Sequence, residues 1–155
     1  MSTDGLHFED LSIGQRFRTA SIEVTADAIS EYAARYDPQP MHLDGVAAEA
    51  GFFGRLVASG WHTLSLTMGL MVRAKPFGAA PLVGVRVDAI RFRRPVLPGM
   101  VLHAEAEIIE LTPPRPSRPD RGLVGMRVAT LAAGETEVLA QDWTVLAFAR
   151  PASPS

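Results

Sequence analysis

The sequence contains no cysteine and a single lysine, Lys75. Without cysteine there can be no disulfide, no thiolate nucleophile and no cysteine metal site. The other fourteen of the fifteen basic residues are arginines, and the formal net charge is −2. A chain of this charge carries no overall positive field, so we expect no nucleic-acid partner. Forked guanidinium groups suit local contacts to phosphate or carboxylate groups.

We expect neither a secretory leader nor a membrane-spanning run in this sequence. Residues 1–11, MSTDGLHFEDL, contain acids and no apolar stretch, unlike a secretory signal. The most apolar segment, residues 56–72, is interrupted by polar residues and is too short for a typical membrane span. We therefore expect no membrane partner and a cytoplasmic location. The 155 residues, 47% of them hydrophobic, predict one soluble domain over 1–155 with flexible termini at 1–8 and 151–155.

Several common functional motifs are missing as well. The chain has no G-x-S-x-G, no Walker A loop and no G-x-G-x-x-G, so nothing favours a nucleophilic serine or a nucleotide site. A metal centre needs clustered histidines and carboxylates, and His42 with Asp44 does not supply such a cluster. We therefore expect no metal.

The first half of the chain is predicted to be mainly helical after one strand. Residues 14–24 alternate weakly and predict a strand. Thr25 is a candidate N-cap for a one-sided helix that ends near Tyr36, because Pro38 disfavours helical backbone at Asp37. Asp44 could cap a short helix, and Ser59 stands before a long apolar helix that ends near Ala74.

The second half alternates as strands do. Apolar residues recur with period two in residues 82–96, 101–111, 123–133 and 137–150, and Gly134-Glu135 is a predicted turn. The phase of the first of these strands shifts at Asp88-Ala89, which predicts a bulge. A single apolar helix must bury its surface against other elements. We therefore expect an α+β fold in which the antiparallel sheet wraps the central helix, which is the hotdog architecture.

The first candidate site is the pair Asp37 and His42, in the stretch YDPQPMHLD. Pro38 and Pro40 stiffen the residues between them and push Asp37 and Gln39 toward extended backbone. A carboxylate and an imidazole held in this way can orient and deprotonate a water molecule. The alternative is a surface turn in which Asp37 accepts backbone hydrogen bonds and His42 merely packs.

The second candidate site is the predicted start of the long helix, Ser59-Gly60-Trp61-His62. With Ser59 as N-cap, the N–H groups of Gly60 and Trp61 lack helical partners and could stabilise a developing negative charge. The glycine would let a ligand carbonyl approach the backbone. The alternative is an ordinary capped helix with a packing glycine, in which His62 is a core or interface residue.

The third candidate site is an arginine cluster, Arg91, Arg93 and Arg94, around the apolar Phe92. Arginines near a sheet edge could bind the phosphates of a cofactor or substrate. They could equally form the solvated face of a strand.

The stretch from Tyr36 to Thr63 resembles the MaoC-like dehydratases, a hotdog family that includes the R-specific enoyl-CoA hydratases. The family motif places an aspartate five residues before a histidine. A proline and then an apolar residue stand directly before that histidine, and a glycine follows some two dozen residues after the aspartate. Asp37, Pro40, Met41, His42 and Gly60 stand at those positions, and the resemblance covers about residues 10–150.

The sequence departs from the family pattern at three positions. Tyr36 precedes the aspartate where the hydratases usually have Ser-Gly, and we expect its bulk to reshape the pocket floor. Gln39 replaces an asparagine and can make similar amide hydrogen bonds. Met68 stands where many members have a supporting serine, next to Thr67.

The resemblance implies reversible syn hydration of a trans-2-enoyl-CoA to a (R)-3-hydroxyacyl-CoA. Asp37 and His42 would share the water, and the Gly60 N–H would bind the thioester carbonyl. Ser59, Trp61 and Gln39 would belong to the same substrate-binding region. The arginines of the third site would bind the CoA phosphates. No cofactor beyond the substrate's own CoA is needed, and at least a homodimer is expected.

Two other functions stay open from the sequence. A hotdog acyl-CoA thioesterase usually takes its acid from the central helix, and residues 61–74 contain neither Asp nor Glu. A non-catalytic acyl-CoA-binding subunit is favoured by the changes at Tyr36, Gln39 and Met68. The intact Asp37 and His42 argue against it.

Overall fold

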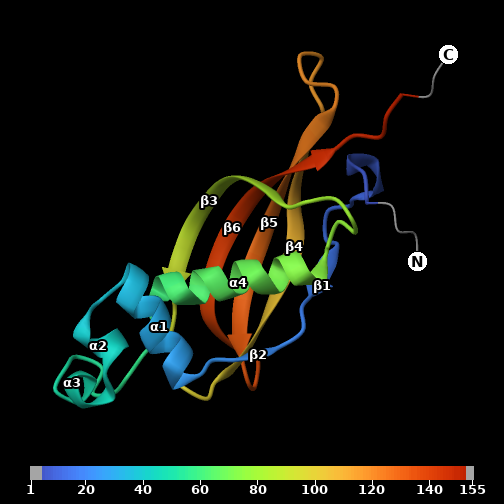
Figure 1. Cartoon of the computed structure of the whole chain (residues 1–155). Helices are drawn as coiled ribbons and strands as arrows, with labels where there is room; N and C mark the ends of the chain where they lie inside the picture. Colours follow the sequence, from blue (N-terminus) through green and yellow to red (C-terminus); the bar gives the residue numbers. More distant parts are fainter. Residues whose placement is uncertain (1–4, 153–155) are drawn as a thin grey trace.

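One long helix, α4 (Gly60–Ala74), lies along one face of an antiparallel sheet that curves around it (Figure 1). The computed structural model of the chain describes residues 5–152. The sheet has the strand order β1-β4-β5-β6-β3, and β2 also pairs with β4. Its strands are β1 (Arg16–Arg18), β2 (Ile22–Glu23), β3 (Val83–Phe92), β4 (Val101–Thr112), β5 (Arg121–Ala132) and β6 (Thr136–Phe148). The predicted α+β hotdog architecture is confirmed.

The strand predicted over residues 14–24 is interrupted. It forms β1 and β2, which both pair with β4, and the chain leaves the ladder between them. The cause is Thr19, whose hydroxyl oxygen accepts a hydrogen bond from the Ala104 N–H at 2.9 Å. The Thr19 N–H still donates to the Ala104 carbonyl at 3.0 Å, so the hydroxyl replaces only the carbonyl that would accept the return bond, and regular pairing ends after this residue.

The short α-helices within residues 26–49 gather around the start of α4 (Figure 1). They are α1 (Ala26–Tyr36), α2 (Pro40–Leu43) and α3 (Gly45–Glu49), and a short 3-10 helix, η1, covers Phe8–Asp10. The predicted caps are confirmed: Thr25 accepts from the Ala28 N–H, Asp44 from Val46 and Ser59 from Trp61. Each cap depends on residues next to it in sequence, which is why the sequence reveals it.

The segment after α1 is more helical than predicted. Gln39 is extended as expected, but Pro40 begins α2, so His42 lies on a helical turn that the sequence pattern does not predict. Proline is favoured at the first position of a helix because its fixed φ suits it and the missing N–H costs nothing there.

The predicted bulge in β3 is confirmed. The register between β3 and β6 shifts between Asp88 and Arg91, and Ala89 has a φ of 51°. The predicted turn between β5 and β6 also forms, with positive φ at Gly134 (77°) and Glu135 (59°). The turn brings Glu135 back over the sheet.

The core lies between α4 and the sheet. Strand β4 shows the alternation clearly: Leu102, Ala104, Ala106 and Ile108 are buried in the core. The alternate side chains between them, those of His103, Glu105 and Glu107, therefore lie on the opposite face of the sheet. Within residues 5–152 no helix is long and apolar enough to cross a membrane.

Residues 1–4 and 153–155, which fall in the termini predicted to be flexible, lie outside the described residues. At the N-terminal side the Leu6 N–H donates to the Phe77 carbonyl at 2.9 Å. Phe8 opens η1.

Candidate active site

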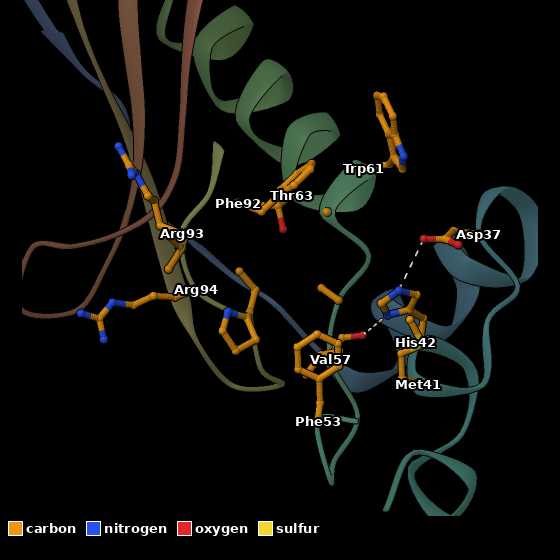
Figure 2. A pocket seen from close by; sticks show the side chains of 15 residues that line it. Asp37, Met41, His42, Phe53, Val57, Trp61, Thr63, Phe92, Arg93 and Arg94 are labelled. Carbon is orange, nitrogen blue, oxygen red and sulfur yellow. Dashed lines mark hydrogen bonds and ion pairs between the residues drawn. The ribbon is translucent and has the colours of Figure 1, made fainter. Parts of the chain in front are cut away.

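A cavity of about 360 Å³ opens beside the start of α4 (Figure 2). Asp37 and His42 lie on one side of it, and Phe92, Arg93 and Arg94 lie on the other. Most of the remaining lining is apolar, with Met41, Phe53, Val57, Ala58, Pro95, Val96 and Val138. A mostly apolar cavity with a few convergent polar groups is the usual form of a small-molecule site.

The structure brings Asp37 and His42 together. The His42 Nε2 lies 3.4 Å from the Asp37 Oδ2, and the two side chains keep only 7% and 17% of their surface exposed. Asp37 is the C-cap of α1, and its N–H donates to the Ala33 carbonyl. The end of α1 and the first turn of α2 thus hold the two groups against each other.

A backbone carbonyl fixes the tautomer of His42. The His42 Nδ1 lies 2.7 Å from the Val57 carbonyl oxygen. Because a carbonyl only accepts, Nδ1 must carry the hydrogen, and in the neutral ring Nε2 then presents its lone pair. Two acceptors, Nε2 and the Asp37 carboxylate, therefore face one point. A water molecule placed there can donate one hydrogen to each of them.

Ser59 and Gln39 hold the Asp37 carboxylate. The Ser59 hydroxyl donates to Oδ2 at 2.7 Å, and the Gln39 amide donates to Oδ1 at 2.7 Å. The Ser59 hydrogen bond is the main cause that lowers the pKa of Asp37 below its usual value; burial opposes it, and Gln39 and His42 reinforce it. Asp37 is therefore a carboxylate at neutral pH.

The helix start offers one of the two predicted donors. The Trp61 N–H is already bonded to the Ser59 hydroxyl at 3.2 Å. Trp61 lines the cavity, but its ring extends away from Asp37 and His42 (Figure 2). Among residues 5–152 the Gly60 N–H has no protein acceptor. A Cβ at position 60 would lie 2.5 Å from the Phe92 ring. A larger residue at position 60 would have to displace that ring, which explains the glycine by packing as well.

The predicted arginines divide into two groups. Arg93 and Arg94 line the cavity, but their guanidinium groups extend away from Asp37 and His42 (Figure 2). The Arg93 Nε donates to Glu137 at 3.1 Å. Arg91 is an exposed residue of β3 and does not line the cavity.

Two of the departures from the family pattern lie outside the cavity. The Tyr36 ring packs against Tyr32, with centroids 5.1 Å apart, and 68% of its surface is exposed. The expectation that Tyr36 reshapes the pocket floor is therefore wrong. Met68 is also exposed on α4. Its neighbour Thr67 is buried and bonds the Thr130 hydroxyl at 2.6 Å.

His62 is a packing residue rather than a base. Its buried ring stacks on Tyr32 at 4.7 Å, and burial lowers its pKa. His62 is therefore a core histidine, the alternative interpretation of this residue.

A protein-family model described as "MaoC like domain" matches residues 9–117. The chain belongs to the MaoC-like dehydratase family. It is 40% identical to a MaoC-like dehydratase from Rhodospirillum rubrum, with a TM-score of 0.89 over 96% of this chain and 100% of that one. It is also 30% identical to the uncharacterized protein YdeM of Bacillus subtilis, over 91% of this chain and 98% of that one.

More distant MaoC-like structures share the fold. The R-hydratase PhaJ1 from Pseudomonas aeruginosa superposes with a TM-score of 0.71 over 97% of both chains at 21% identity. At that identity the likeness concerns the fold alone. In this chain the shared fold holds the end of α1, α2 and the start of α4 around one cavity.

Replacing Ser59 with alanine is expected to raise the pKa of Asp37 toward its ordinary value. A lowered folded pKa stabilises the fold above the unfolded pKa of about 3.9, and that contribution is lost as the pH falls through the folded pKa. Losing the hydrogen bond and the cap should also lower the free energy of unfolding at pH 7 by about 1 kcal/mol. Carboxyl ¹³C NMR titration and thermal unfolding measure the two effects.

The matched control for this change is Ser65→Ala. The Ser65 hydroxyl, on the same helix, is hydrogen-bonded to the Tyr32 hydroxyl and to the Trp61 carbonyl. Ser65→Ala should leave the pKa of Asp37 unchanged. Equal pKa values for Asp37 in wild type and Ser59→Ala would contradict the role given to Ser59.

Proposed function

We propose that this MaoC-like protein is a hydro-lyase that reversibly adds water to a trans-2-enoyl-CoA, giving a (R)-3-hydroxyacyl-CoA. One observation carries the proposal: the Asp37 carboxylate and the His42 Nε2 lie 3.4 Å apart and face an apolar cavity. The R-hydratase from A. caviae, described as involved in PHA biosynthesis, shares the fold with a TM-score of 0.71.

In the proposed reaction, Asp37 and His42 act on one water molecule. The water donates one hydrogen to the Asp37 carboxylate, which orients it, and the other to the His42 Nε2. As the water oxygen bonds to C3, Nε2 takes that second proton, and the C2–C3 π electrons move onto the thioester as an enolate. The Gly60 N–H would stabilise the enolate oxygen.

The second half of the reaction returns the proton. The imidazolium of His42 delivers its proton to C2 from the same side, so hydrogen and hydroxyl add syn and one water is consumed. Asp37 stays ionised throughout and stabilises the imidazolium, a role that suits its lowered pKa. No cofactor is required, and reversal of the steps gives dehydration.

The substrate's CoA would extend from the cavity mouth. Arg93 and Arg94 lie at the wall opposite the catalytic pair, and their side chains lead outward (Figure 2). Guanidinium groups bind phosphates well, so these two residues are the proposed contacts to CoA. The apolar lining would take the acyl chain.

We also propose that two copies form a dimer along β3. This edge strand is exposed over its whole length and carries exposed Val83, Val85, Val87, Ile90 and Phe92. An open apolar edge is a template for pairing, and a second copy would cover it. Val85→Lys is expected to shift the protein from dimer to monomer in light scattering. Val46→Lys on α3 is the control, and a mass of one chain for wild type would contradict the dimer.

One assay separates hydration from the two alternatives. The protein is mixed with crotonyl-CoA and with longer and branched enoyl-CoA esters, while double-bond absorbance and free thiol are followed together. Double-bond loss without thiol supports the hydratase. Thiol release supports the thioesterase, and binding with neither change supports a non-catalytic subunit.

A further inference from the structure

A second group of polar side chains meets on the sheet face turned away from α4. His103 and Glu105 lie two residues apart on β4, and Glu135 comes from the turn between β5 and β6. One donor atom from each of the three residues lies within 4.8 Å of the other two. The proposed hydration uses none of these residues.

His103 is the unusual member of this group. The residue keeps 7% of its surface exposed, and its Nε2 is fully enclosed without a hydrogen-bond partner. That nitrogen lies 3.7 Å from the Glu105 Oε1 and 3.7 Å from the Glu135 Oε2. Buried polar atoms are rarely left without a partner, so a ring nitrogen aimed at two carboxylates calls for a bridging group.

The two distances from the His103 nitrogen suit a metal ion as that bridge, and the two carboxylate oxygens lie within 4.8 Å of each other. Zinc binds histidine nitrogen and carboxylate oxygen at about 2.0–2.2 Å, so neighbouring ligands in a tetrahedral site are about 3.3–3.6 Å apart. The two histidine-to-carboxylate distances, both 3.7 Å, are within a few tenths of an ångström of that spacing. One nitrogen and two carboxylates are a donor set for a divalent transition metal rather than for Mg²⁺.

Arg18 is positioned to hold the carboxylates. It donates to the Glu105 Oε1 at 2.6 Å and to the Glu135 Oε1 at 3.1 Å. Each ionised carboxylate has about four lone-pair sites, so it can accept from Arg18 and still bind a cation. Such outer contacts orient metal ligands in other proteins. With neutral His103 the four side chains carry a net charge of −1, which attracts a divalent cation.

We propose that His103, Glu105 and Glu135 bind one divalent transition-metal ion, with Arg18 as the residue that orients both carboxylates. The site joins β4 to the β5–β6 turn and lies apart from the catalytic cavity. It is independent of the proposed hydratase activity.

Zinc binding to the untagged, chelator-treated protein tests the proposal. Isothermal titration with ZnCl₂ at pH 7 should give one saturable site, and MgCl₂ should give none. Glu135→Gln, a change at an exposed turn, is expected to weaken zinc binding at least tenfold. Glu107→Gln is the matched control on β4, because Glu107 pairs with Arg16 outside the group. It should bind zinc as the wild type does.

Two further measurements locate the ion. Imidazole ¹⁵N NMR should show the His103 Nε2 resonance shift on zinc addition. Zinc binding should weaken in acid, because protons compete with the metal for its ligands. The proposal is overturned if wild type shows no saturable binding up to millimolar zinc, if Glu135→Gln binds as tightly as Glu107→Gln, or if binding is lost in Asp37→Asn instead.

Discussion

Asp37→Asn is expected to lower kcat/KM for crotonyl-CoA hydration by about 10²–10⁴-fold, the range typical of an acid–base group. Asparagine keeps the shape of the side chain and can still accept from Ser59. Its amide carries no charge to stabilise an imidazolium, and an N–H turned toward His42 would occupy the nitrogen that must bind water. The loss of double-bond absorbance measures the rate.

The control for Asp37→Asn is Asp44→Asn, a few residues along the chain. Asp44 caps α3 and does not line the cavity, and asparagine is an equally good cap. Asp44→Asn should therefore keep the wild-type rate. Hydration by Asp37→Asn within tenfold of wild type would show that the pair has been misassigned.

The pH dependence follows from the same carboxylate. Because the pKa of Asp37 lies below its ordinary value, the carboxylate stays ionised at neutral and mildly acidic pH. Its contribution to hydration should be lost only as the pH falls through that lowered pKa. Ser59→Ala should raise the pH at which Asp37 is protonated, as followed by carboxyl ¹³C NMR.

His42→Ala is expected to be as damaging, again by about 10²–10⁴-fold. The change removes both the nitrogen that takes the water's proton and the Nδ1–H that bonds the Val57 carbonyl. The effect should fall on kcat more than on KM, because the cavity walls that would bind the acyl chain remain. Steady-state kinetics separate the two parameters.

His42→Gln is the second variant at this position, since it fills most of the space and guards against a loss that merely reflects a cavity. His7→Ala is the control: that ring contacts the Gly5 carbonyl and is far from the cavity in the fold. Wild-type hydration rates in both His42 variants would show that His42 takes no part in the mechanism.

The sequence predicted those features that depend on near neighbours. Thr25, Asp44 and Ser59 were identified as caps because a cap and its partner are two or three residues apart. The bulge at Asp88-Ala89 was visible as a phase shift within one strand. The convergence of Asp37 and His42 was predicted from a motif confined to a few residues.

The features that the sequence missed join distant segments. The Val57 carbonyl is fifteen residues from His42, and the Ser59 hydroxyl is twenty-two residues from Asp37. Nothing in the sequence pairs them, although each decides the chemical state of its partner. The group around His103 was missed for the same reason, since Glu135 reaches it only through a turn and a strand pairing. Tyr36 was misjudged because a position next to Asp37 in sequence faces another side of α1.

The tie between α2 and Val57 has a consequence for how this family can vary. The Val57 N–H donates to the Met41 carbonyl at 3.0 Å, and the Val57 carbonyl accepts from His42 at 2.7 Å. Both ends of the intervening loop are thus clamped at the base. Its tip carries Phe52, which is 95% exposed, and Phe53, which reaches the cavity wall. The segment between these two hydrogen bonds, which contains α3, can therefore change in length and at its tip without moving His42. Under the proposed function, such changes would alter which acyl groups fit the cavity.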